Sequence, residues 1–403
     1  MHLHAALSLA LCACAASGAP ASFGHPGGVV GAADLAAARA RLAAGVEPTT
    51  SFVRAAAARP QGKASYAAGG PPANGTISCG YYDKPDIGCS AQMADVDAAY
   101  TQALLFALGA GDAALAAASR RILTLYTAGL KRYTNNTEGT CCGNEALQAA
   151  WVGTKLARTG ELLRHTAGSG WSDAETAALS ALLYNVHVPL LIGGTPANGN
   201  WEASFVDTLV ATAVFSENAT LYDNAVARWR GRAPSYFYIA SDGAAPPPNP
   251  QPNCAPQPVC EWYNQTVFDA RVSGVCQETC RDMGHMQMGF AAFLSGAATA
   301  TLQGDDLLRE QGPRLFAASE FAASLLNGAR PVTDPLLCSG RAGGVIGSLA
   351  PTFELAHALF ARLGLDDAQT RRQLANVRAK FVASGELYIC GPWETITFGL
   401  PLP

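Results

Sequence analysis

Alanine-rich segments in which apolar residues recur every three or four positions follow one another along most of this chain. That spacing lines up apolar side chains on one face of an α-helix, so it predicts a succession of helices. The predicted helices are Ala32–Leu42, Ala94–Leu108, Ala113–Leu130, Glu145–His165, Asp173–Val186, Trp201–Phe215, Thr220–Trp229, His285–Leu302, Pro313–Leu326, Thr352–Leu363 and Asp367–Val382. Strand signals are confined to Tyr236–Ala240 and Leu387–Cys390. The pattern predicts an all-α fold of antiparallel helix hairpins, which can close into a toroid, extend as a solenoid or form a bundle.

Two stretches interrupt the helical pattern. Residues Pro60–Cys89 are rich in proline, glycine and small polar residues, and Asp242–Cys260 contains several prolines that no helix tolerates. Loops of this length in a domain are usually functional or disordered. Because cysteines bound the second stretch, we expect it to be an ordered lid or cleft wall and not a free linker. Helices of the same character lie on both sides of it, so we expect a single domain spanning 19–403.

The first 18 residues have the features of a secretory signal peptide, with an apolar stretch followed by small residues. Export agrees with the cysteines, since two of the twelve lie in this segment and the remaining ten suggest five disulfides. Cys79–Cys89 and Cys254–Cys260 are candidate local pairs. The sequons at Asn74, Asn135, Asn218 and Asn264 would mark surface positions in a glycosylating host. We therefore expect a secreted, disulfide-bonded glycoprotein.

Charge and motifs exclude several classes of protein. The net charge is −4 and no run of Lys or Arg occurs, which argues against nucleic-acid and anionic-membrane partners. No phosphate-binding glycine loop, dinucleotide fingerprint, HExxH or GxSxG motif is present. The cysteine spacing builds no zinc site, so no metal and no cofactor are expected.

The densest cluster of chemically active residues lies between Cys276 and His285. On a helix, Glu278, Arg281 and His285 would share one face by their spacing. A guanidinium beside an imidazole suits a site that binds an anion and moves a proton. The alternative is a Glu278–Arg281 ion pair next to a core histidine.

Three further clusters carry side chains that bind sugars. Asn200 and Trp201 follow a glycine-rich loop, where Asn200 could cap a helix or donate to a carboxylate. Asn144, Gln148 and Trp151 would form one stripe of a helix. Aromatic residues that act in proton transfer or simply pack complete the set: Tyr236, Tyr238 and Tyr263.

At these clusters the chain resembles the alginate-lyase-like superfamily of secreted polysaccharide lyases, and most closely the alginate and polyglucuronate lyases. The resemblance spans most of the mature chain. The residues that carry it are His25-Pro-Gly, Asp34–Leu42, Asn144–Trp151, Asn198–Glu202, Tyr222–Arg232, Ser241–Gly243, Gln277–Asp282 with His285, Gln303–Asp305, Pro351–Glu354 and Trp393–Thr395. It implies an α/α toroid, an incomplete α/α barrel, and cleavage of an acidic polyuronate by β-elimination without a metal.

The resemblance also implies roles for residues. Asn200 and Arg281 would neutralise the uronate carboxylate, which acidifies the neighbouring C5 proton. His285 and Tyr263 would act as base and acid, in an order left open. The remaining candidates, Asn144, Gln148, Trp151, Trp201, Tyr236, Tyr238 and Glu278, would bind substrate. The chain departs from the family where Trp201, and not histidine, follows Asn200, and where Gln287 takes the place of a tyrosine.

Two other functions remain open. An inverting glycoside hydrolase would need two carboxylates about 6.5–9.5 Å apart, for which Glu202, Glu278, Asp282 and Glu354 are candidates. A secreted carbohydrate-binding protein would bind the glycan without cutting it. In each case we expect a monomer whose partner is an acidic polysaccharide.

Overall fold

The computed structural model describes residues 20, 22–80, 85–134, 144–195, 197, 199–251, 260–340, 353–384 and 393–402. Helices dominate these ranges, which confirms the predicted all-α class. They are α1 (Ala32–Ala43), α2 (Thr49–Ala58), α3 (Cys89–Ala107), α4 (Ala113–Gly129), α5 (Glu145–Arg164), α6 (Asp173–Leu182), α7 (Val188–Leu191), α8 (Gly199–Phe215), α9 (Ala219–Tyr236), α10 (Met283–Leu302), α11 (Leu307–Glu310), α12 (Gly312–Leu326), α13 (Phe353–Arg362), α14 (Ala368–Ser384) and α15 (Trp393–Phe398).

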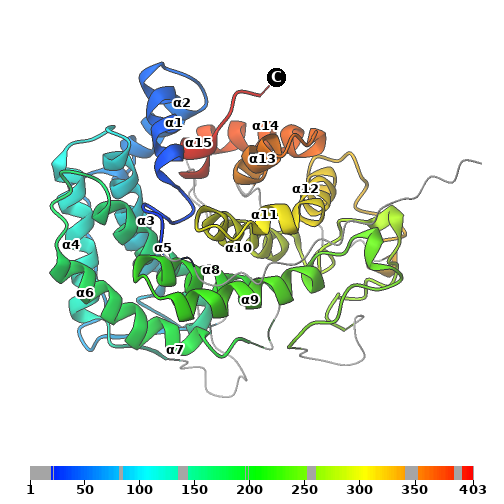
Figure 1. The fold of residues 1–403 in the computed structure, drawn as a ribbon, viewed down its shortest axis with the longest axis horizontal. Helices are drawn as coiled ribbons and strands as arrows, with labels where there is room; N and C mark the ends of the chain where they lie inside the picture. The colour runs from blue at the N-terminus through cyan, green and yellow to red at the C-terminus, as the bar shows by residue number, and fades with distance from the viewer. Residues whose placement is uncertain are drawn as a thin grey trace, which may run out of the picture.

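The helices form a ring. Helix α3 packs on α5, α5 on α8, α8 on α10 and α10 on α13, and contacts through α15 and α2 lead back to α3. Helices α4, α6, α9, α12 and α14 pack against members of this inner series. Figure 1 shows α10 near the centre, with α4 and α6 at one side and α12 to α14 at the other. This arrangement is an α/α toroid, as the resemblance implied.

Two strands in the long loop before α3 and one after α4 form a small sheet that the sequence did not predict. Strand β1 (Thr76–Cys79) pairs antiparallel with β2 (Asp86–Ile87) and parallel with β3 (Arg132–Thr134). The strand predicted at Tyr236–Ala240 is wrong, because Tyr236 ends α9 and Phe237 makes a single bridge to Cys276. The strand predicted at Leu387–Cys390 lies outside the described residues.

The cysteines partly follow the prediction. Cys79 and Cys89 form the expected local disulfide, and a second disulfide joins Cys280 to Cys338 across 58 residues. Cys260 is also disulfide-bonded, whereas its predicted partner Cys254 lies outside the described residues. Cys276 is a free, buried thiol, so the expectation that all ten cysteines pair is wrong.

Apolar helix faces meet in a continuous core, and they also enclose many polar side chains. Among them is His187, which ends the short π-helix Leu183–His187 and is fully buried. Its Nδ1 lies 2.8 Å from the carbonyl oxygen of Ala149, and the ring packs edge-on against Tyr133. Burial lowers the pKa of His187 to about 4, although the bond to Ala149 opposes the shift.

We expect His187 to make the fold sensitive to acid. The unfolded chain protonates this histidine near its ordinary pKa of 6.5, so between that pH and about 4 the unfolded state binds more protons. The free energy of unfolding should therefore fall by about 2 kcal/mol between pH 7 and pH 5 through this group alone. Urea unfolding at both pH values measures the change. His187→Asn keeps an amide donor for the Ala149 carbonyl but does not titrate. The free energy of unfolding of this variant should therefore fall by about 2 kcal/mol less between pH 7 and pH 5 than that of the parent protein. An equal fall in both proteins would show that His187 is not the titrating group.

Among the described helices, none is long and apolar enough to cross a membrane.

Candidate active site

Glu278 is the centre of the predicted cluster. Its side chain is fully buried and accepts hydrogen bonds from residues far apart in the sequence. The backbone N–H and side-chain amide of Asn200 donate to it at 3.0 and 2.7 Å, the hydroxyl of Tyr236 at 2.9 Å, and Nη1 of Arg281 at 2.9 Å. The carboxylate thus satisfies an N–H in the first turn of α8, where a negative charge is favourable. Glu278 positions its neighbours and does not line a substrate surface, which corrects its predicted role.

Tyr236 reaches Glu278 through a narrow gap between two helices. A Cβ at Gly199 of α8 would lie 2.2 Å from the Tyr236 ring, and one at Gly289 of α10 would lie 2.2 Å from its hydroxyl oxygen. Any larger residue at either glycine would collide with this ring. Tyr236 is fully buried, so the structure corrects its predicted contact with substrate to a supporting one.

The segment that carries Glu278 and Arg281 is a turn and not the helix that the sequence suggested. Helix α10 begins only at Met283, because the Asp282 side chain caps it by accepting from the His285 backbone N–H at 2.8 Å. The pair of Glu278 and Arg281 nevertheless forms as predicted. The disulfide at Cys280 ties this turn to Cys338, which restricts the movement of the adjacent Arg281.

Asp282 also binds the ring of His285. Its other oxygen lies 2.5 Å from Nδ1 of the imidazole. Burial raises the pKa of Asp282, but the hydrogen bonds from the His285 ring and backbone outweigh it, so this pKa lies below its ordinary value. A carboxylate that holds the proton on Nδ1 leaves a lone pair on Nε2. The His285 side chain is 24% exposed, and its second nitrogen is thus suited to accept a proton.

Tyr263, in the same connection between α9 and α10, completes the cluster. The Arg281 guanidinium lies 5.9 Å from the centre of the Tyr263 ring, and Tyr263 has a positive φ of 51° that fixes its direction. Burial and the charge of Glu278 raise the pKa of Tyr263 to about 12, although Arg281 opposes them. The phenol therefore keeps its proton at neutral pH and can act only as an acid there.

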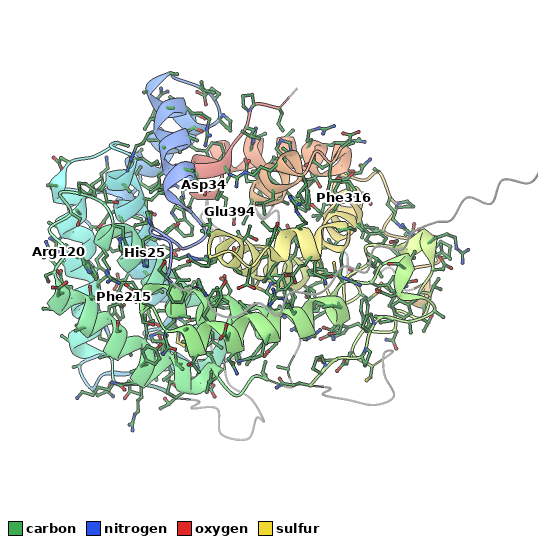
Figure 2. All side chains as sticks on the ribbon, viewed as in Figure 1. His25, Asp34, Arg120, Phe215, Phe316 and Glu394 are labelled. Carbon is green, nitrogen blue, oxygen red and sulfur yellow. A yellow bond between two sulfur atoms is a disulfide. The ribbon has the colours of Figure 1, made fainter. Side chains whose placement is uncertain are left out.

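A pocket lies inside the ring, and the residues that line it do not include those of the cluster. Trp151, Ser204 and Met288 line it, one helical turn along α5, α8 and α10 from Gln148, Asn200 and His285. Helices α3, α5, α8, α10 and α15 contribute to its wall. Polar and aromatic residues of the wall include Tyr100, Lys155, Arg158, Asp207, Trp393 and Glu394, and Figure 2 labels Glu394.

Solved structures share the fold of this chain. A variant of alginate lyase A1-III complexed with a tetrasaccharide matches with a TM-score of 0.60 and 16% identity, over 86% of this chain and 90% of that chain. Alginate lyase A1-III from Sphingomonas species A1 gives the same score and identity, over 87% and 92%. An alginate lyase from Bacteroides ovatus gives 0.57 and 14%, over 93% and 99%. The chain has the alginate-lyase fold.

No family model and no curated protein sequence matches the chain. Because this chain shares only 14–16% identity with the alginate lyases of the same fold, the roles of its residues are argued from its own contacts.

The other predicted residues divide between the pocket and the interior. Trp151 lines the pocket, and Asn144 is partly exposed at the start of α5. Gln148 is buried and donates to the carbonyl oxygen of Cys89 and to the side chain of Gln92. Trp201 is 9% exposed. Tyr238 is buried and donates to the carbonyl oxygen of Gly243, which removes it from the substrate-binding candidates.

Sequence reasoning missed Asp282 as the partner of His285, although an acidic residue three positions before a histidine at a helix start was a usable signal. It also missed the inner wall of the pocket. Arg158 could have been found, since it continues the stripe of Trp151 on α5. Asp207 carried no signal, and Glu394 was noted only within the segment Trp393–Thr395 of the resemblance, because only the closed ring brings α8 and α15 to the same pocket.

Proposed function

We propose that this protein is a polysaccharide lyase that cleaves an acidic polyuronate, alginate or glucuronan, by β-elimination. The observation that carries the proposal is the pairing of His285 with Asp282 beside Arg281, at the N-terminal ends of α8 and α10. An oriented imidazole and a guanidinium are the two groups that abstraction of a proton next to a carboxylate needs.

Asn200 and Arg281 bind the uronate carboxylate in this proposal. Glu278 orients both of them, and a guanidinium has more N–H donors than Glu278 and Tyr263 use. Hydrogen bonds to the carboxylate stabilise the negative charge that develops when the C5 proton leaves. Asn200 would donate the second N–H of its side-chain amide, since the first goes to Glu278.

His285 is the base and Tyr263 the acid. Nε2 of His285 takes the C5 proton, the electron pair forms the C4=C5 double bond, the C4–O4 bond breaks, and the Tyr263 hydroxyl protonates the leaving O4. A pKa of about 12 for Tyr263 supports this order, because a protonated phenol is available at neutral pH. Trp151, Trp201 and Asn144 would bind adjacent sugars.

The hydrolase alternative is less well supported, because each of its candidate carboxylates has a partner. Glu202 pairs with Arg228 and Glu354 with Arg378, and both carboxylates are buried. Glu278 accepts the bonds described above, and Asp282 holds His285. A free general acid and a free general base are therefore missing from this set.

The proposal includes export and a single catalytic domain over 19–403, acting as a monomer. The test is to incubate the mature protein with polymannuronate, polyguluronate, polyglucuronate and pectate, and to follow ultraviolet absorbance from the unsaturated product. Absorbance should rise with one of the first three polymers. New reducing ends without absorbance would replace the proposal with hydrolysis, and binding without either signal would replace it with a carbohydrate-binding role.

A further inference from the structure

A second cluster of polar side chains lies apart from the candidate active site, where the N-terminal segment crosses α5. His25, which Figure 2 labels, places Nδ1 2.5 Å from Oε1 of Glu161 on α5. His165, at the end of α5, places Nε2 3.8 Å from Oε2 of the same carboxylate. The two imidazole rings are stacked, with centres 4.2 Å apart and planes 7° from parallel. Each ring therefore turns one nitrogen towards Glu161.

The backbone around His25 is fixed independently of these histidines. Gln303 bonds the N–H and carbonyl of Gly24 and the carbonyl of Gly27. A Cβ at Gly27 would lie 2.0 Å from the carbonyl oxygen of Gly24, so only glycine fits this turn. The segment thus presents His25 to Glu161 as part of a preformed arrangement.

The cluster contains polar atoms that its protein contacts leave unsatisfied. Glu161 is 2% exposed, and its Oε1 accepts from His25 and from the N–H of Gly27. Within the described part of the chain, neither Oε2 of Glu161 nor Nε2 of His165 has a hydrogen-bond partner, although both atoms are buried. A buried, unpaired carboxylate oxygen facing an unpaired imidazole nitrogen costs free energy. Their separation is too long for a hydrogen bond and fits an ion held between them.

The types of ligand indicate which ion. Two imidazoles and a carboxylate are a typical zinc donor set, with each bond near 2.0–2.2 Å. Calcium and magnesium take oxygen ligands and would leave both histidines unused. One ligand atom from each of His25, Glu161 and His165 lies within 4.8 Å of the others. Because the two rings are parallel, one imidazole must turn before both lone pairs reach the same ion, and a water molecule would supply the fourth ligand.

We propose that His25, Glu161 and His165 bind one zinc ion, which fastens the N-terminal segment to α5. This site is separate from the proposed lyase site, whose chemistry needs no metal. The proposal differs from the sequence analysis, which expected no metal site. An ion that binds only the folded chain raises its stability by mass action. Zinc should therefore raise the melting temperature without changing turnover.

The test uses the whole mature protein, freed of metal with a chelator and titrated with zinc chloride in a calorimeter. We expect one zinc per chain, together with a melting temperature several degrees higher. His165→Asn and His25→Gln each remove a ligand at a position that tolerates a polar side chain, and each should weaken binding at least ~10-fold and abolish the thermal shift.

His357→Asn is the matched control. It changes another histidine bonded to a carboxylate, His357 Nδ1 to Asp367 Oδ2 at 2.8 Å, and should bind zinc like the parent. Absence of one-to-one binding by the parent protein overturns the proposal. So does unchanged zinc affinity in both His165→Asn and His25→Gln, or loss of binding only when His285 is replaced, since that result would place the ion in the active site.

Discussion

Replacing His285 with alanine should lower the turnover of polyuronate at least ~100-fold, the usual contribution of a positioned general base. The imidazole is held by Asp282 at 2.5 Å and is 24% exposed, so its removal takes away the proton acceptor without opening a core cavity. Turnover is measured from the initial rate of ultraviolet absorbance at saturating substrate. Circular dichroism should show an unchanged fold.

Asp282→Asn is a sharper variant of the same experiment. Asparagine caps a helix as well as aspartate does, so α10 should still begin at Met283. The substitution removes the negative charge that holds the proton on Nδ1 of His285, and turnover should fall at least ~10-fold with little loss of stability. The control His357→Asn should leave turnover unchanged. If His285→Ala retains near-normal turnover, His285 is not the base and the site assignment fails.

The fold followed from the sequence because apolar spacing is a local property. Segments such as Glu145–His165 and His285–Leu302 were predicted within two residues of the observed α5 and α10. The boundary at Met283 differed because the Asp282 cap, and not the pattern of apolar residues, decides where α10 begins. The closure of the helices into a toroid could be predicted only from the resemblance, because a helix bundle shows the same periodicity of apolar residues.

The candidate site was predicted less completely, because its geometry depends on contacts between distant residues. The spacing of Glu278 and Arg281 indicated their pair, but not that Glu278 is buried among Asn200 and Tyr236. Residues chosen for their chemistry alone, such as Tyr238, turned out to pack in the core. Likewise, a cysteine count cannot reveal that Cys276 remains a free thiol.

Glu278→Ala should have the largest effect on stability of any single change in the cluster. It would leave the Asn200 amide, the Tyr236 hydroxyl and the Arg281 guanidinium without their shared acceptor. Breaking a buried ionic network by removing one partner typically costs about 3–5 kcal/mol of the free energy of unfolding. Urea unfolding measures it. Glu310→Ala is the control, because Glu310 also pairs with an arginine, Arg230, but is 40% exposed, and surface pairs contribute about 1 kcal/mol or less.

Glu278→Gln distinguishes two roles of Glu278, stabilising the fold and orienting Asn200 and Arg281 for catalysis. Glutamine has the same shape, so the protein should stay folded at 25 °C. An oxygen in the place of Oε1 can still accept from Arg281 and the Asn200 side chain, but without the negative charge these hydrogen bonds are weaker. An NH2 group in the place of Oε2 cannot accept from the Asn200 backbone N–H, so Asn200 loses part of the support that positions it. We expect turnover to fall more than substrate affinity, because charge develops on the uronate carboxylate mainly in the transition state. Normal turnover in a folded Glu278→Gln protein would mean that Asn200 and Arg281 are held by other contacts, and that Glu278 serves stability alone.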